Sequence, residues 1–115
     1  MDRKRQLKEE YKQLKKEMGL IGATCLETGR TYLEATNRTK ASINKLLFTL
    51  KLGSHRCEEL QREWSKYGEG AFEIKVLEVL EYDEREPDRD YTDDLELLKL
   101  EWIDRLKREG TELML

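Results

Sequence analysis

One histidine and the arginine beside it are the residues of this chain whose types suit chemistry on a phosphate. His55 and Arg56 follow Gly53 and Ser54 at a junction that is expected to open a helix. A helix start presents free backbone N–H groups, so an imidazole and a guanidinium there could hold an anion and move a proton. A single histidine at a helix start is also commonly a surface or capping residue, and both interpretations stay open.

Other catalytic patterns are weak or missing from the sequence. The acidic run from 81 to 94 could attract a divalent cation, but it lacks the spacing of a calcium-binding loop and is typical of a solvated loop. No G-x-S-x-G, phosphate-binding loop or H-E-x-x-H pattern occurs. Cys25 and Cys57 have no CxxC spacing, so we expect two buried thiols rather than a zinc site or a disulfide. These residues alone predict a soluble α+β domain.

Composition and charge limit where a polyanionic partner could bind. The 115 residues suffice for one domain, and no apolar run approaches the roughly 18 residues of a membrane span. The N-terminus lacks the apolar core of a signal peptide, so we expect a cytoplasmic protein with no membrane contact. The net charge of −3 divides into +5 for residues 1–69 and −8 for residues 70–115. Any contact with nucleic acid should therefore come from the front part.

The first part of the chain predicts a helix and a hairpin. Residues 1–18 are expected to form an amphipathic helix packed on the domain, with a stripe at Leu7, Tyr11, Leu14 and Met18. A phosphate-contacting arm and a short self-pairing helix are the alternatives, the latter giving a weak homodimer instead of a monomer. A single domain then covers 19–110. It begins with strands at 20–26 and 31–36 around a turn at Gly29.

The middle and end of the domain predict three helices and one more strand. The apolar spacing within 39–52 gives a helix that Gly53 stops, and Ser54 is expected to cap the next helix. Residues 71–80 predict the central strand, and a helix capped by Thr92 follows a loop. Residues 111–115 are a tail. The predicted fold is a small three-stranded antiparallel sheet flanked by helices, in the order α-β-β-α-α-β-α.

The segment from Gly19 to Trp64 resembles the GIY-YIG nuclease family, in particular its small bacterial members. The most specific part of the resemblance is a string of residues that runs past the second predicted helix. It consists of Lys51 to Arg56, Glu59-Leu60-Gln61, Trp64, Tyr67-Gly68 and Phe72-Glu73. The likeness extends over roughly residues 10–106 and implies the same order of elements as the sequence patterns.

The resemblance also implies that most of the family's catalytic residues are replaced. Its Gly-Ile-Tyr motif falls on Gly19-Leu20-Ile21, so Ile21 stands for a tyrosine, and its Tyr-Ile-Gly motif falls on Tyr32-Leu33-Glu34. Ser42 matches the arginine that stabilises the phosphate. Leu46 matches a frequent histidine, whereas His55 matches a later histidine and is kept. Lys99 matches the glutamate that holds the divalent metal ion.

These replacements predict a fold that has lost metal-dependent hydrolysis, a pseudoenzyme with Tyr32 and His55 as remnants of its pocket. No cofactor is expected, and weak DNA binding could remain. The candidate phosphate contacts are Lys40, Lys45, Lys51, Arg56, Arg62 and Lys66.

Two other functions stay open. An active Mg²⁺-dependent endonuclease would require Glu96, one helical turn before Lys99, to be the metal ligand and Arg38 to replace the lost arginine. A protein-interaction module would use the N-terminal stripe.

Overall fold

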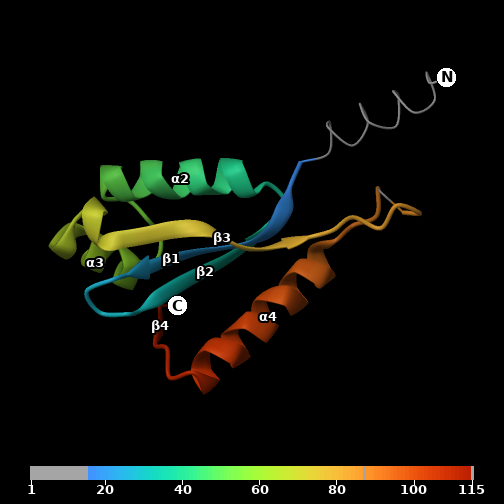
Figure 1. The fold of residues 1–115 in the computed structure, drawn as a ribbon. Helices are drawn as coiled ribbons and strands as arrows, with labels where there is room; N and C mark the ends of the chain where they lie inside the picture. The colour runs from blue at the N-terminus through green and yellow to red at the C-terminus, as the bar shows by residue number, and fades with distance from the viewer. Residues whose placement is uncertain (1–15, 87, 115) are drawn as a thin grey trace.

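The core of the molecule is a four-stranded mixed sheet in the order β3-β1-β2-β4, seen in the computed structural model of Figure 1. The structure describes residues 16–86 and 88–114. Strand β1 (Met18–Cys25) pairs antiparallel with both β2 (Thr31–Thr36) and β3 (Phe72–Leu80). Strand β4 (Leu113–Met114) pairs with β2 in parallel. The predicted sheet of three antiparallel strands was therefore incomplete, because a strand of two residues has no periodicity to detect in the sequence.

Helices cover both faces of the sheet. Helices α2 (Thr39–Leu52) and α3 (Glu58–Tyr67) lie on one face, and α4 (Thr92–Arg108) lies on the other, below the sheet in Figure 1. A short 3₁₀ turn, η1 (Glu69–Ala71), leads into β3. Alternate residues of each strand serve the two layers: Ile21 packs with α2 and α3, whereas Leu20 packs with α4. No helix in the described ranges is long and apolar enough to cross a membrane.

The central position belongs to β1 and not to β3, which corrects the prediction for residues 71–80. Strand β3 is an edge strand, and Val79 is 40% exposed on it. Strand β1 is almost wholly buried, and two glycines allow β3 to approach it closely. A Cβ on Gly19 would lie 2.1 Å from the Glu78 carbonyl oxygen, and one on Gly22 would lie 2.7 Å from Leu77 Cδ1. The apolar residues of β3 identify a strand covered by helices, but they do not fix its place in the sheet.

The predicted N-terminal helix lies mostly outside the described residues. The last residue of its predicted apolar stripe, Met18, belongs to a strand. Met18 begins β1 and packs with Tyr91 and Leu95, so it does not extend a helical stripe, and Gly19 continues the strand. Leu7, Tyr11 and Leu14 fall in the part that the structure does not describe.

The helix limits follow the sequence patterns closely, except at two caps: Tyr91, and not the predicted Thr92, is the N-cap of α4. Helix α2 spans the predicted residues, and Gly53 ends it with φ of 75°. Ser54 does not cap α3, since Cys57 occupies the N-cap position. Residues 111–115, predicted as a tail, contribute β4, because Met114 is buried in the core.

Candidate functional site

A groove runs along the edge of β2 that β4 leaves open, between the start of α3 and the first turns of α4. Within the described residues β4 pairs with β2 only at Thr31 and Tyr32, so the remainder of β2 lies at the floor of the groove. The charged and polar residues that line it include Tyr32, Glu34, Arg56, Glu58, Glu96 and Lys99. The groove therefore draws on three separate parts of the chain, which only the tertiary fold brings together.

Tyr32 is the buried phenol at the centre of this groove. Its hydroxyl donates a hydrogen bond to Glu34 Oε1 at 3.2 Å, because residues two apart in a strand lie on the same face of the sheet. Burial and the adjacent Glu34 carboxylate raise the pKa of Tyr32 to about 12, although the Arg56 charge opposes them. Tyr32 therefore stays a neutral hydrogen-bond donor near pH 7 and is a poor base.

His55 lies edge-on to the Tyr32 ring, with 5.2 Å between the ring centroids, and its own polar groups hold the loop between α2 and α3. The backbone N–H of Cys57 donates to His55 Nδ1 at 3.0 Å, and the backbone N–H of His55 donates to Gln61 Oε1 at 3.0 Å. Burial lowers the pKa of His55, and the adjacent Arg56 charge acts in the same direction. The imidazole is therefore neutral at pH 7, with its proton on Nε2, and shapes the groove wall.

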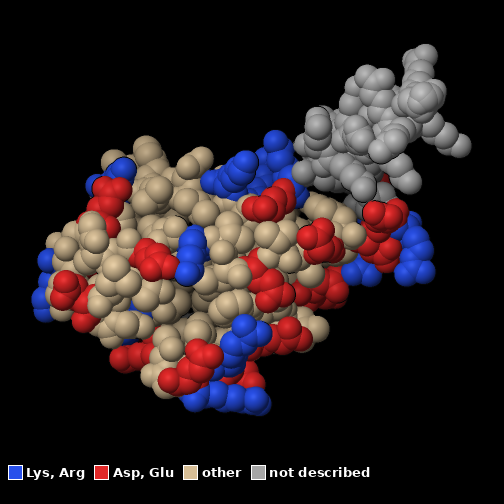
Figure 2. All heavy atoms as spheres, viewed as in Figure 1, with Lys and Arg blue, Asp and Glu red and all other residues tan. Residues whose placement is uncertain are grey.

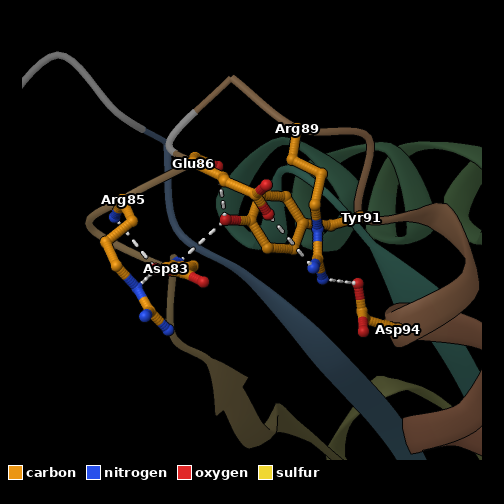
Figure 3. A network of polar contacts seen from close by, with 6 residues as sticks. All are labelled: Asp83, Arg85, Glu86, Arg89, Tyr91 and Asp94. Carbon is orange, nitrogen blue, oxygen red and sulfur yellow. Dashed lines mark hydrogen bonds and ion pairs between the residues drawn. The ribbon is translucent and has the colours of Figure 1, made fainter.

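The loop before α4 folds over Tyr91 and forms one end of the groove (Figure 3). The Tyr91 hydroxyl accepts from the Asp83 N–H at 2.8 Å and donates to the Glu86 carbonyl at 2.8 Å. Arg89 stacks over the Tyr91 ring, 4.6 Å from its centroid, and pairs with Asp94. The carboxylates of Asp83, Glu86 and Asp94 pair with arginines of the same loop and thus serve the loop itself. Among the described residues, no group of three or more His, Cys, Asp or Glu side chains could hold a metal ion.

Two solved structures share this arrangement of elements. The chain matches the catalytic domain of homing endonuclease I-TevI with a TM-score of 0.67 and 19% identity, over 85% of this chain and 98% of that one. It matches an alanine-substituted catalytic domain of intron endonuclease I-TevI with a TM-score of 0.59 and 19% identity, over 84% and 90% of the two chains. No protein-family model matches the sequence, and no curated protein matches it. The chain has a GIY-YIG-like fold.

In this GIY-YIG-like fold, the residues that the resemblance predicted at the family's catalytic positions occupy unlike environments. Ile21 is fully buried in the core beside Tyr32 and is not part of the groove lining. Ser42 is held by the side chain of Thr36, with 2.5 Å between the two hydroxyl oxygens. Lys99 lines the groove, and so does Glu96. The sequence offered these two as alternative residues for one position and placed them one helical turn apart on the same side of the helix, and both line the groove.

The residues of the predicted altered nuclease site are only partly brought together. Glu96 and Tyr32 line the groove and His55 packs on Tyr32, whereas Arg38 is exposed and is not among the lining residues. The metal ion of GIY-YIG nucleases does not fit this donor set. A divalent cation beside Glu34 and Glu96 would face the Lys99 ammonium in the same groove.

The predicted phosphate contacts are all exposed, but they do not form one surface. Lys40, Lys45 and Lys51 belong to α2, and Arg62 and Lys66 belong to α3. Arg56 lines the groove together with several acids. Figure 2 shows blue spheres gathered over the start of α2, with red and blue mixed elsewhere on this face of the molecule. Of the two helices that carry these basic residues, α2 contains no Asp or Glu.

Sequence reasoning missed an ion-pair network that ties the hairpin to α3. Arg30 donates from Nη1 to Glu63 Oε2 at 2.6 Å and from Nη2 to Glu59 Oε2 at 2.5 Å, and Thr28 donates to Glu63 Oε1 at 2.6 Å. Burial alone would raise the pKa of Glu63, but the bonds from Thr28 and Arg30 outweigh it and lower that pKa. The one local signal was the position of Glu63 beside Trp64 on the buried side of an amphipathic helix.

Proposed function

We propose that this chain is a GIY-YIG-like domain that binds nucleic acid weakly and does not hydrolyse it. The observation that carries the second half, the absence of hydrolysis, is that Lys99 lines the same groove as Tyr32 and Glu34. Metal-assisted phosphoryl chemistry needs oxygen ligands for the cation and a positive group for the phosphate. By the resemblance, Lys99 stands at the position of the glutamate that holds the metal ion. Ser42, an uncharged hydroxyl, stands at the position of the arginine that stabilises the phosphate.

The loss of the arginine is expected to abolish useful turnover even where a metal ion is supplied. Removing such a group from a phosphoryl-transfer site typically costs on the order of 10³ in rate or more. Ser42 is bonded to Thr36, and the exposed Arg38 lies outside the groove lining. The raised pKa of Tyr32 adds to this loss, because a phenol that ionises near pH 12 is rarely a phenolate at pH 7.

The binding half of the proposal rests on α2. Its 14 residues include three exposed lysines and no Asp or Glu, whereas α3 carries Glu58, Glu59 and Glu63. Lysines that are not neutralised by acids on their own helix can contact phosphates and release counterions. Three such contacts predict a shallow dependence of the binding constant on salt, with a log–log slope of roughly −2 to −3.

The nuclease half is tested by incubating the purified protein with supercoiled plasmid in Mg²⁺ or Mn²⁺. We expect the plasmid to remain supercoiled. Cleavage that disappears in both Tyr32→Phe and Glu96→Ala would overturn the proposal in favour of an altered but active site. Glu101→Ala, which removes one carboxylate at an exposed position of α4, is the control for the effect of charge in Glu96→Ala.

The binding half is tested by DNA affinity measured between 20 and 200 mM salt. We expect measurable binding at low salt and a reduced slope when Lys45 and Lys51 are replaced by glutamine. Absence of binding at the lowest salt, or an affinity that does not change with salt, would contradict it.

A further inference from the structure

An aromatic side chain stands at the centre of the solvent face of α2. Phe48 is 63% exposed, although the residues two positions before and after it, Leu46 and Leu50, are 2% and 1% exposed. Two residues correspond to about 200° of helical rotation, so Phe48 points almost directly away from the core. Leu52, four residues later, lies on the same side and is 64% exposed. Phe48 therefore contributes little to the fold at a position where a polar residue would be ordinary.

Lysines flank this aromatic ring on both sides. Lys45 and Lys51 lie three residues before and after Phe48, and three-residue steps in opposite directions place them to either side of the ring. Lys51 approaches Glu69 at 3.6 Å, but both side chains are more than half exposed, so this pair neutralises the lysine weakly. Lys45 has no ion pair within residues 16–86 and 88–114.

We propose that this face of α2 binds single-stranded nucleic acid, with a base stacked on Phe48 and the backbone phosphates beside Lys45 and Lys51. The inference rests on the binding half of the proposed function and names its ligand. An exposed aromatic ring between cations is the arrangement that holds single strands, because every unpaired base presents a π face. In a duplex the bases are already stacked on each other, and Phe48 gains no such contact.

The charge of the face argues against its being covered by a second copy of the chain. Pairing α2 of one copy with α2 of another would bring lysines against lysines, which is unfavourable where no acid of the helix compensates them. The remainder of the molecule is predominantly acidic, since the chain has a net charge of −3. Such a molecule would repel a polyanion except at a surface where cations are clustered without acids. Among the helices of the described residues, α2 is the one that contains no acid.

The test compares a labelled 12-nucleotide oligothymidine with a duplex of the same length by fluorescence anisotropy at 50 mM salt. We expect Phe48→Ala to weaken binding to the single strand by roughly 5- to 150-fold, the range found for single base–aromatic stacks, and to leave duplex binding within twofold. Phe48→Trp should retain single-strand affinity. Leu100→Ala is the matched control, because Leu100 is a 57% exposed apolar residue on α4, the helix on the other face of the sheet.

The possible failures are distinguishable. If Phe48→Ala binds the single strand as the wild type does, while Lys45→Gln and Lys51→Gln weaken both ligands, the inference is wrong and the proposed function stands. If the wild type binds neither ligand, both are wrong. A dimer in sedimentation that dissociates in Phe48→Ala would assign the face to self-association and would likewise overturn the inference. Thermal unfolding of the Phe48 variants checks that the fold is kept.

Discussion

Replacing Arg30 by alanine should destabilise the protein more than the exposure of this arginine suggests, because it leaves a buried carboxylate without its cation. Glu63 is 7% exposed and accepts hydrogen bonds from Arg30 and Thr28. Removing one partner of a buried ion pair costs about 3–5 kcal/mol. The Arg30 side chain is 21% exposed and the Thr28 bond remains, so we expect the lower end of that range, about 3 kcal/mol.

Glu59→Gln supplies the contrast within the same network. Glu59 accepts from the same guanidinium, but its side chain is 42% exposed. An exposed ion pair contributes about 0–1 kcal/mol, so we expect the free energy of unfolding to fall by less than 1 kcal/mol. The double variant with Arg30→Ala and Glu63→Gln should recover part of the loss, since it removes the stranded charge along with its partner.

The pH dependence provides a second, independent check. The pKa of Glu63 is lowered in the folded wild type, so its stabilising effect is present above the unfolded pKa and is lost as the pH falls through the folded pKa. Without Arg30, burial is the larger influence and should raise that pKa. Protonation of Glu63 then stabilises the variant, so the difference in stability between the two proteins should narrow as the pH falls from the raised pKa of the variant to the lowered pKa of the wild type.

Urea unfolding followed by tryptophan fluorescence measures these effects, since Trp64 is adjacent to Glu63 in α3. A loss below 1 kcal/mol in Arg30→Ala would show that Glu63 is solvated in the variant or that the network is not formed. A difference in stability that does not change between pH 7 and pH 3 would refute the electrostatic reasoning separately.

Three further predictions follow from the site and the sheet. Gly19→Ala should prevent the β1–β3 pairing, because its Cβ would meet the Glu78 carbonyl oxygen at 2.1 Å, whereas Gly70→Ala, with nothing within 4 Å, should unfold like the wild type in urea. His55 is the single histidine, so one NMR titration should give a midpoint below the ordinary 6.5, and a midpoint above it would contradict the buried geometry. The pKa of Tyr32, raised to about 12, should make stability fall between pH 10 and pH 12 as the unfolded phenol ionises first, and Tyr32→Phe should reduce this fall in thermal unfolding.

Local patterns predicted those parts of the fold that depend on neighbours in sequence. The apolar spacing of 39–52 and the glycine after it gave α2 its limits, because helix periodicity and the left-handed conformation of Gly53 act within a few residues. The Thr28-Gly29 turn predicted the β1–β2 hairpin, and strand alternation placed Tyr32 and Glu34 on one face.

Features that depend on distant partners were beyond the sequence. Whether β1 or β3 is central is decided by which strand pairs with a neighbour along both edges, and both strands are rich in apolar residues. The cap predicted at Ser54 failed because the His55 contacts with Cys57 and Gln61 continue the loop for three more residues.

The sequence by itself determined the hairpin, the helices and strand that follow it, and a resemblance that predicts which residues stand at the catalytic positions of the GIY-YIG family. The tertiary structure decided what those residues do. It buried Ile21, bonded Ser42 to Thr36 and placed both Glu96 and Lys99 in one groove. Residue types and helical spacing are local properties of the chain, whereas burial, charge neighbours and the meeting of α4 with β2 arise only when separate elements of the chain pack together.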